Sequence, residues 1–410
     1  MGKTLEQVFD GEELLKITKD LVAIDSSTTC PARERNVAEY LLELFKKEGI
    51  RAWVQEVKDG RGNVIAVLKG DGRGKSLMLN GHMDTVPVTG MEDPFRGKTE
   101  DGWLWGRGTA DMKGGLAAMA YALILLKRME VVLHGDLVFA GVIEEEAATS
   151  AGSRHIAAHG PITDYAIVGE PTDLYPVTAH KGIDYFEVRF QGKAAHSSQP
   201  DNGVNAVYGA AEYIRLVREE LAAEYKKRRH PLTGAPTVNA GLIRGSAGAN
   251  EKFLKGEADT FAGIVPDQCT VWLDIRWTPC ETVEGILKEL RELAERTKQK
   301  IPGLQVEVHY MDLPRPAMEI GENEELTEAV REQVARYDPE RAVLTGVSYF
   351  ADSGILKGIG GIPSMILGPG DIAVAHGMDE RIEISQICGA ARIYAGTALA
   401  VCGKQKEGIM

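Results

Sequence analysis

The sequence predicts an α/β protein in which a mixed sheet is covered by helices on both faces and carries a smaller inserted domain. Three observations lead to this prediction. The chain has 410 residues, which is too long for one ordinary core. Several short, nearly continuous apolar runs are typical of strands buried on both faces. Near residue 180 the pattern changes to alternating strands and amphipathic helices, and core-like runs return only from residue 342.

The first part of the chain supplies most elements of the main sheet. Residues 11–23 and 33–49 have apolar positions at helical spacing and are expected to form surface helices. The clearest buried helix is expected at Gly114–Lys127, after a glycine-rich turn. The buried strands are expected at Asn63–Leu68, Ser76–Asn80, Asp136–Ile143, Tyr165–Val168 and Pro363–Leu367.

The inserted segment alternates between polar and apolar positions. Its strands are expected at Asp184–Phe190, Thr270–Arg276 and Val306–Tyr310, and its helices at Val204–Lys227 and Thr282–Lys298. We therefore expect a discontinuous main domain of residues 1–179 and 313–410, with an α+β domain of residues 180–312 inserted into it.

Composition argues against several classes of partner. The formal net charge is −13, and the short Lys226–Arg229 run is the one basic block, so we expect no nucleic-acid partner. The five cysteines form no CxxC pair, which favours a reducing, cytoplasmic compartment. The N-terminus has no apolar signal core, and the apolar run Leu116–Leu126 is short for a membrane span, so no membrane partner is expected.

Polar side chains follow the predicted buried strands where each strand ends. His82 and Asp84 follow the second strand, Glu144–Glu146 follow the third, and Glu170 follows the fourth. His376 comes shortly after the last strand, and Asp111 lies in a glycine-rich turn before the buried helix. Because ligands bind at the carboxyl ends of strands in α/β sheets, these groups should meet at one edge.

Each of these residues has an ordinary structural explanation when it is taken alone. A single histidine is more often a hydrogen-bonded structural residue, and Asp111 could simply cap a helix. A solvated acidic run, however, does not normally continue a buried apolar strand. Two histidines together with three carboxylates form a mixed nitrogen and oxygen ligand set that suits two divalent metal ions.

The ordered segments GHMDTVP, GRGTADMKGG, EEE, VGEPT and AHGMDE resemble the M20 family of metallopeptidases and deacylases. The resemblance covers nearly the whole chain. It implies a di-metal catalytic domain with an inserted lid domain through which the protein forms a homodimer. It also implies two bound metal ions, with Zn²⁺ as the default and Co²⁺ or Mn²⁺ as possible substitutes.

The resemblance also assigns roles to individual residues. His82 and Glu170 would each bind one metal, Asp111 would bridge both, and Glu146 and His376 would complete the set. Asp84 would hold the His82 ring by its second nitrogen, and Glu145 would be the general base. Glu144 then takes the place of the family's Asp in an Asp-Glu-Glu run, and a cis peptide is expected after Asp111.

Three residues of the inserted domain are further candidates. His196, in a motif similar to one in the family, would stabilise the oxyanion and could serve the site of a dimer partner. Arg276 would bind a substrate carboxylate or form an ordinary salt bridge, and Asn239 is a weaker polar candidate. Gly263 replaces the family's usual Asn, so either Asn250 of the Asn250–Ala262 insertion supplies the amide or the loop is remodelled.

The resemblance favours a hydrolase that cleaves the amide bond of a small N-acyl amino acid, as acetylornithine deacetylase or succinyl-diaminopimelate desuccinylase does. Two alternatives stay open: an M20 carboxypeptidase or dipeptidase acting on short peptides, and a catalytically silent metal-binding scaffold. The segment Gly70–Ser76 looks like a phosphate-binding loop, but Lys69 stands where its first glycine is required. A nucleotide-binding function is therefore not expected.

Overall fold

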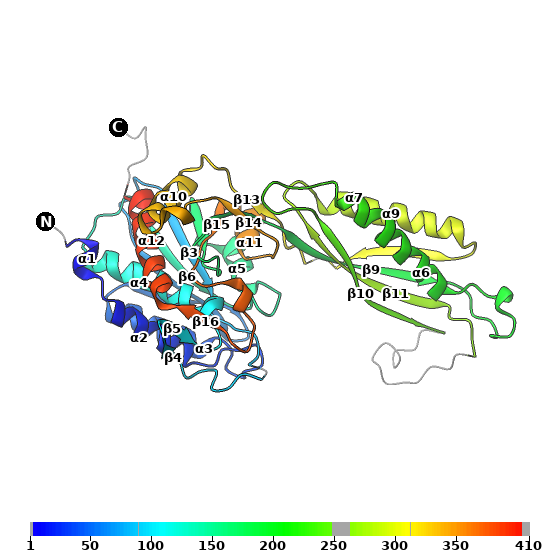
Figure 1. Cartoon of the computed structure of the whole chain (residues 1–410), viewed down its shortest axis with the longest axis horizontal. Coiled ribbons are helices and arrows are strands. Elements are labelled where there is room, and N and C mark those ends of the chain that lie inside the picture. Colours follow the sequence, from blue (N-terminus) through cyan, green and yellow to red (C-terminus); the bar gives the residue numbers. More distant parts are fainter. Residues whose placement is uncertain (1–2, 89, 248–262, 312, 404–410) are drawn as a thin grey trace. The chain divides into compact units, whose positions relative to one another are not determined.

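The computed structural model describes residues 3–88, 90–247, 263–311 and 313–403. The chain folds as two compact units, which Figure 1 shows in the colours of the sequence. The first unit contains Met1–Ala179, Met318–Gly346 and Ala351–Met410, and the second contains His180–Ala317 and Val347–Phe350. The predicted insertion of residues 180–312 lies within the second unit.

The first unit is built on a mixed sheet, as the predicted fold class requires. β3 runs parallel to β6 and β7, whereas β2 runs antiparallel to β1 and β6. β14 (Thr345–Val347) pairs with β8 beside the main order. That order is β1 (Arg51–Lys58), β2 (Arg61–Leu68), β6 (Leu137–Val142), β3 (Leu77–His82), β7 (Tyr165–Val168), β15 (Ser364–Ile366), β8 (Val177–His180) and β13 (Met318–Glu319).

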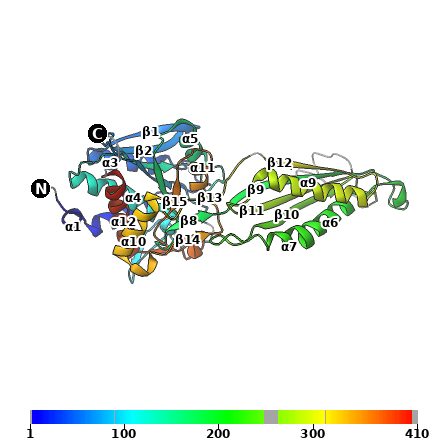
Figure 2. The same cartoon turned by 90° about the horizontal axis from the view of Figure 1, so that it is seen from above.

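Helices cover both faces of this sheet. On one face, α5 (Ala151–His159) and α11 (Ser353–Gly358) enclose an apolar cluster that includes Met78 and Val138. Phe139 points to the other face and stacks edge to face on Phe45 of α3. The other helices of the unit are α1 (Leu5–Val8), α2 (Gly11–Val22), α3 (Arg35–Lys47), α4 (Gly114–Arg128), α10 (Glu325–Tyr337) and α12 (Ile384–Cys402). Figures 1 and 2 show α4 and α12 packed side by side.

Short elements complete the first unit. A three-stranded sheet is formed by β16 (Arg381–Glu383), β5 (Trp103–Trp105) and β4 (Lys98–Glu100). The short helical turns are η1 (Thr109–Lys113), η4 (Pro339–Arg341) and η5 (Ile372–Val374). Among the described residues, one helix, Thr109–Arg128, is long and apolar enough to cross a membrane, although its apolar window is wholly buried in the unit. A buried core helix passes the same test, so the helix is weak evidence for a span.

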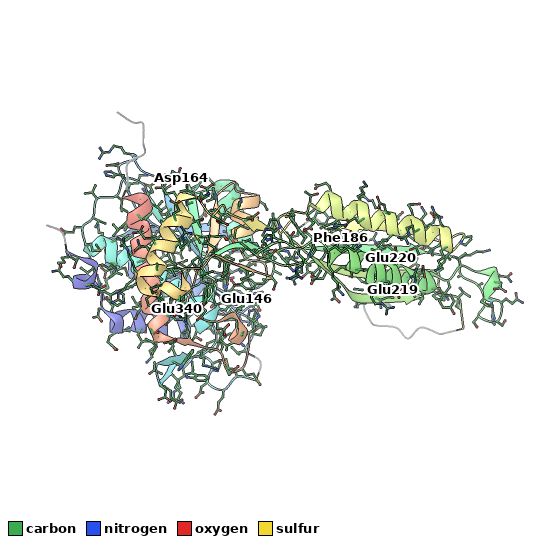
Figure 3. All side chains as sticks on the ribbon, turned by 45° about the horizontal axis from the view of Figure 1, so that its top comes forward. Glu146, Asp164, Phe186, Glu219, Glu220 and Glu340 are labelled. Carbon is green, nitrogen blue, oxygen red and sulfur yellow. The ribbon has the colours of Figure 1, made fainter. Side chains whose placement is uncertain are left out.

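The second unit is an antiparallel sheet covered on one side by helices. Its strands follow the order β10 (Thr237–Ser246), β11 (Gln268–Trp277), β9 (Gly182–Gln191) and β12 (Gln305–Tyr310). Alternate residues of β11 are buried, and they pack with Phe186 of β9, which Figure 3 labels. The helical elements are η2 (Pro200–Asn202), α6 (Ala206–Leu216), η3 (Val217–Leu221), α7 (Ala222–Tyr225) and α9 (Val283–Lys300).

The predicted elements are found, and their bounds differ in instructive ways. The strand predicted at Ser76–Asn80 continues to His82, so this histidine is itself the last strand residue. The helix predicted at Val204–Lys227 consists of two α-helical pieces, α6 and α7, joined by the π-type turn η3. Two of the longer strands, β1 and β10, were not predicted because each is largely exposed along its length and presents no buried run. The short strands β4, β5, β8, β13, β14 and β16 were not predicted either.

Candidate metal centre

Parallel strands bring four of the predicted residues, His82, Glu145, Glu146 and Glu170, to one edge of the sheet. β3 pairs in parallel with β6 so that His82 lies beside Val142, and Glu144–Glu146 follow two residues later. β3 also pairs in parallel with β7, which ends two residues before Glu170. The carboxyl ends of these strands therefore deliver the histidine and the carboxylates to one place, as the sequence predicted.

Asp111 and His376 reach the same place from irregular segments. Asp111 lies in η1, between Gly108, which has a φ of 80°, and the start of α4. Its own φ and ψ of −124° and 97° are not helical, and the Asp111–Met112 peptide is cis, as the resemblance implied. His376 follows η5 with a φ of 64°. Both side chains are thus presented by backbone that no regular element fixes.

The side chains of Asp111 and the two histidines are arranged around the Asp111 carboxylate. His82 Nε2 lies 2.9 Å from Asp111 Oδ1, and His376 Nε2 lies 3.2 Å from Asp111 Oδ2. Each oxygen of this carboxylate therefore faces a different imidazole ring. A carboxylate that bridges two cations through both of its oxygens presents them in this way.

Three glutamates complete the cluster. His376 Nε2 lies 3.1 Å from Glu146 Oε1, and His82 Nε2 lies 3.8 Å from Glu170 Oε2. Ligand atoms of His82, Glu145 and Glu170 lie within 4.8 Å of one another, as do those of His82, Asp111 and Glu146. Figure 3 labels Glu146 in the first unit. All five predicted metal ligands and the predicted general base thus meet in one cluster.

The electrostatics of this cluster fit divalent cations. Burial and the nearby Asp111 raise the pKa of Glu170 to about 7, and burial together with Glu170 holds the pKa of Glu145 well above its usual value. Hydrogen bonds to Asp111 and Glu146 raise the pKa of His376 to about 10. Protons on Glu145, Glu170 and His376 therefore offset the negative charge of the cluster when no cation is bound. Glu170 Oε1 is buried and has no hydrogen-bond partner among the described residues, which leaves a ligand atom available.

Asp84 contacts the second ring nitrogen of His82, and it does so through its main-chain carbonyl. His82 Nδ1 lies 2.9 Å from the main-chain carbonyl of Asp84, whereas its distance to the Asp84 carboxylate is 3.6 Å. The carboxylate instead accepts the backbone N–H groups of Glu145 and Glu146, at 3.2 and 3.0 Å. Asp84 thus orients the His82 ring through its backbone and the acidic segment through its side chain.

Glu144 is held away from the cluster by Arg61. The guanidinium of Arg61 forms ion pairs with both Glu144 and Glu34, and all three side chains are buried. Thr149 Oγ1 also donates to Glu144 at 2.7 Å. This arrangement supports the predicted register, with Glu145 and Glu146 as the two functional glutamates. Sequence reasoning missed Arg61, although an arginine at the start of a buried strand was a visible signal.

The other predicted residues belong to the second unit. His196 is exposed, its Nδ1 lies 2.8 Å from Ser198 Oγ, and its backbone forms a bridge with Ile264. Arg276 donates two hydrogen bonds to the carboxylate of Asp274. It therefore forms the ordinary salt bridge that was the predicted alternative to substrate binding. Asn239 is exposed on β10 opposite Asp274. The Asn250–Ala262 insertion lies outside the described residues.

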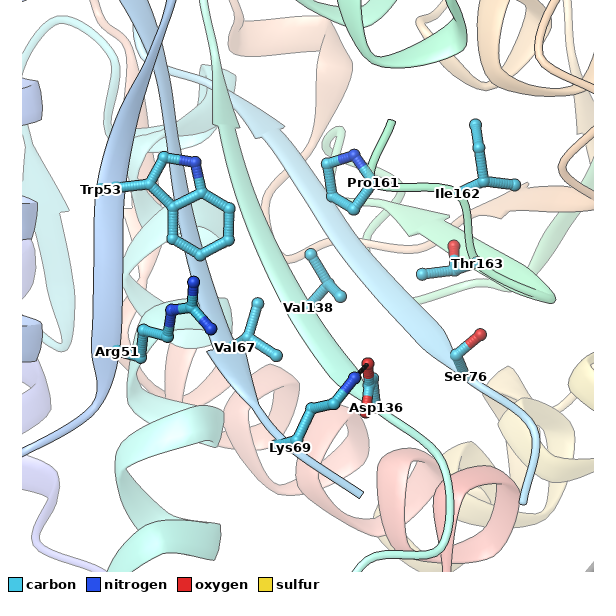
Figure 4. Close-up of a pocket in the computed structure, with 10 residues that line it drawn as sticks. All are labelled: Arg51, Trp53, Val67, Lys69, Ser76, Asp136, Val138, Pro161, Ile162 and Thr163. Carbon is cyan, nitrogen blue, oxygen red and sulfur yellow. Dashed lines mark hydrogen bonds and ion pairs between the residues drawn. The ribbon is translucent and has the colours of Figure 1, made fainter. Parts of the chain in front are cut away.

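A separate pocket lies at the opposite edge of the sheet (Figure 4). It has a volume of about 360 Å³ and lies at the amino ends of β3 and β6, where Ser76 and Asp136 line it. Lys69 and Asp136 form an ion pair of 2.6 Å across its rim. The segment Gly70–Ser76 is a turn that leads into β3 and not into a helix, so it does not have the context of a phosphate-binding loop.

A mixed α/β sheet with histidines and carboxylates clustered at the carboxyl ends of its strands is typical of a metal-dependent enzyme. The chain belongs to peptidase family M20/M25/M40, whose model matches residues 78–400. This membership confirms the family resemblance that the sequence motifs showed.

Relatives and solved structures agree with this assignment. The chain is 31% identical to the acetylornithine deacetylase of Vibrio parahaemolyticus over 401 residues, which covers 95% of this chain and 98% of the relative. Its fold is similar to that of the aminopeptidase PepT from Bacillus cereus, with a TM-score of 0.74, 23% identity and coverage of 96% and 99% of the two chains. It is also similar to a dinuclear metal binding M20 peptidase from Bacillus subtilis, with a TM-score of 0.72, 16% identity and coverage of 96% and 98%.

The ion pairs of Arg61 lead to a prediction about stability. Replacing Arg61 by Met should lower the free energy of unfolding by about 3–5 kcal/mol near neutral pH, because Glu34 and Glu144 would stay buried without a buried cation. Burial opposes the ionisation of Glu144, but hydrogen bonds from Arg61 and Thr149 outweigh it and lower its pKa. A lowered carboxyl pKa stabilises the fold above the unfolded pKa of about 4.3 and ceases to do so as pH falls.

The difference in stability between the Arg61→Met variant and the native chain should therefore be large at about pH 7 and should narrow once pH falls below about 4.3, for example at about pH 3. Urea unfolding of the variant and of the native chain at the two pH values measures this difference in stability. Arg73→Met, which removes the exposed pair with Asp71, is the control and should cost far less. A difference that does not change with pH would contradict the account of Glu144.

Proposed function

We propose that the chain is a two-metal amidohydrolase that cleaves the amide bond of a small N-acyl amino acid. One observation carries the metal-dependent part of this proposal. The two oxygens of the Asp111 carboxylate face the Nε2 atoms of two different histidines, His82 and His376. A mixed nitrogen and oxygen set around a shared carboxylate suits a pair of divalent ions.

The proposed ligand sets follow from these contacts. His82, Asp111 and Glu170 would hold one ion, and His376, Asp111 and Glu146 would hold the other. Zn²⁺ is the ion that we propose, because imidazole and carboxylate ligands both suit it, and Co²⁺ or Mn²⁺ could replace it. Ions bound there would lower the pKa of a water molecule and polarise the amide carbonyl of the substrate.

Glu145 is the proposed general base. Its carboxyl group lies with His82 and Glu170 at the cluster, with the ligand atoms of the three residues within 4.8 Å of one another. It would take a proton as the water oxygen forms its bond to the amide carbon. It would then give that proton to the amine nitrogen as the carbon–nitrogen bond breaks.

The substrate class rests on the relatives. The acetylornithine deacetylase of Vibrio parahaemolyticus matches this chain at 31% identity over nearly the full length of both chains. We therefore propose an N-acetyl amino acid as the first substrate to test, with an N-succinyl amino acid or a short peptide as the alternatives. The motif segments are shared by deacylases and peptidases, so the choice between them depends on residues outside the cluster.

The second unit would contribute to binding and assembly. We propose that it mediates a homodimer and that His196 stabilises the oxyanion, in the site of the same or of the partner subunit. Arg276 would bind a substrate carboxylate only after exchanging its contact with Asp274. All five cysteines are free thiols, which agrees with a cytoplasmic location.

The oxyanion role of His196 can be tested by mutation. His196→Ala should fold and bind both ions normally while kcat falls by about 10²–10³-fold, because one donor to the oxyanion is lost. Steady-state kinetics on the metal-loaded variant measure this, and His309→Ala, which removes a partly exposed histidine of β12, is the control. An unchanged kcat would remove His196 from the mechanism.

The roles of Glu145 and Glu146 can be separated in the same way. Glu145→Gln should keep both ions and lose about 10²–10⁴-fold in kcat, because the proton acceptor is lost. Glu146→Gln should instead bind one ion weakly, since it removes a carboxylate ligand. Metal content by mass spectrometry and single-turnover rates distinguish the two variants. If Glu146→Gln keeps both ions and Glu145→Gln loses one, the assigned register is wrong by one residue.

The proposed activity is tested most simply with a panel of substrates. Amine release from N-acetyl amino acids, N-succinyl amino acids and dipeptides would be compared between Zn²⁺-loaded and chelator-treated protein. We expect metal-dependent hydrolysis of an N-acetyl amino acid. Cleavage of dipeptides alone would favour the peptidase alternative. Two bound ions with no hydrolysis of any of these substrates would favour the scaffold.

A further inference from the structure

Arg107 and Glu380 form a buried ion pair close to the cluster, and the proposed mechanism does not use it. The exposed fractions of the two residues are 2% and 0%. Both lie in segments whose motifs resemble the family, GRGTADMKGG and AHGMDE, but no role was assigned to either residue from sequence. Two charges removed from water in this way cost desolvation energy, so the pair is weak evidence for stability by itself.

The carboxylate of Glu380 holds the backbone that carries Asp111. Its Oε1 accepts the N–H groups of Ala110 and Asp111, at 3.0 and 3.2 Å, and its Oε2 accepts from Arg107 Nη1. The main-chain carbonyl of Glu380 also accepts the N–H of Gly106, at 3.1 Å. Glu380 therefore fixes both ends of the turn from which Asp111 projects.

Arg107 connects this turn to the segment of His376. Its Nη2 donates to the main-chain carbonyl of His376 at 3.3 Å, while its Nη1 contacts Glu380. The backbone N–H of Arg107 is itself anchored to the carbonyl of Pro94, at 2.8 Å. The Arg107 guanidinium thus connects the turn that carries Asp111 with the segment of His376 and with the Glu380 carboxylate.

The other ligands do not need such a connection. His82 is the last residue of β3, and Glu170 closely follows β7, so the ladder of the sheet positions both. Glu146 is held by the Asp84 carboxylate. Asp111 and His376, in contrast, lie in irregular backbone outside the sheet, and the distance between them depends on side-chain contacts.

We propose that Arg107 and Glu380 are positioning residues that set the spacing between Asp111 and His376, and thereby the affinity for the ion on the His376 side. This inference rests on the proposed two-metal function. It assigns the two residues mainly to the ion on the His376 side, because both irregular ligands of that ion, Asp111 and His376, are held by this pair, whereas the other ion would share only Asp111 and keeps two ligands set by the sheet. Outer partners of metal ligands commonly affect metal affinity by about 10–100-fold.

Metal titration of three variants tests this. Glu380→Gln keeps the size of the side chain but leaves Arg107 without its carboxylate, and Arg107→Lys keeps the charge but cannot span both contacts. The control is Arg128→Lys, which alters a paired arginine at the far end of α4, in contact with Glu13 and Glu48. Chelator-buffered Zn²⁺ titrations would give the two affinities, and Co²⁺ absorption spectra would report the geometry of each site.

We expect the native chain and Arg128→Lys to bind two ions alike. In Glu380→Gln, the affinity for one ion should fall by about 10–100-fold, with a changed Co²⁺ spectrum for that ion, while the affinity for the other ion, which shares only Asp111, should fall clearly less. Arg107→Lys should show a smaller loss at the same ion. Thermal unfolding in the presence of chelator gives the stability of each metal-free variant. If Glu380→Gln does not fold, the affinities of Arg107→Lys for the two ions test the inference.

Two results would overturn the inference while leaving the proposed function intact. One is unchanged affinity for both ions, and the other is an equal loss at both ions that follows a lower metal-free melting temperature. If the native chain itself binds fewer than two ions, the proposed two-metal function fails, and this inference fails with it.

Discussion

The structure depends on a concentration of buried negative charge that the protein cannot neutralise by itself. Asp111, Glu145, Glu146 and Glu170 meet around two histidines, and the electrostatics of the cluster retain protons on groups that would otherwise ionise. Buried charges are expensive unless they are paired or bind metal ions. The cluster therefore makes chemical sense as a cation site, and much of the surrounding architecture keeps these side chains close together despite their repulsion.

Two kinds of support hold the cluster. The carboxyl ends of β3, β6 and β7 deliver His82, the acidic run and Glu170, so the register of the sheet sets their relative positions. The irregular segments are instead held by charged side chains whose oxygens accept backbone N–H groups, as Asp84 does for Glu145 and Glu146. Arg61 pairs with Glu144 and holds it away from the cluster. The three consecutive glutamates Glu144–Glu146 therefore have different surroundings.

Much of this could be predicted from sequence, because it depends on short-range patterns. One apolar run ends at His82, and another ends two residues before Glu170. These runs predicted both the strands and the candidate ligands, because a buried strand rarely continues into charged residues without a functional reason. The exposed strands β1 and β10 carried no such pattern. The partners of Asp84 and Arg61 could not be predicted, because those contacts join segments that are far apart in sequence and depend on the backbone conformation of loops.

The central claim is that Asp111 bridges two metal ions, and anomalous X-ray diffraction from crystals of the Zn²⁺-loaded protein tests it most directly. We expect two anomalous peaks about 3.5–4 Å apart. One peak should lie within bonding distance of His82 and Glu170, the other within bonding distance of His376 and Glu146, and Asp111 should contact both. A single peak, or two peaks without Asp111 between them, would contradict the account.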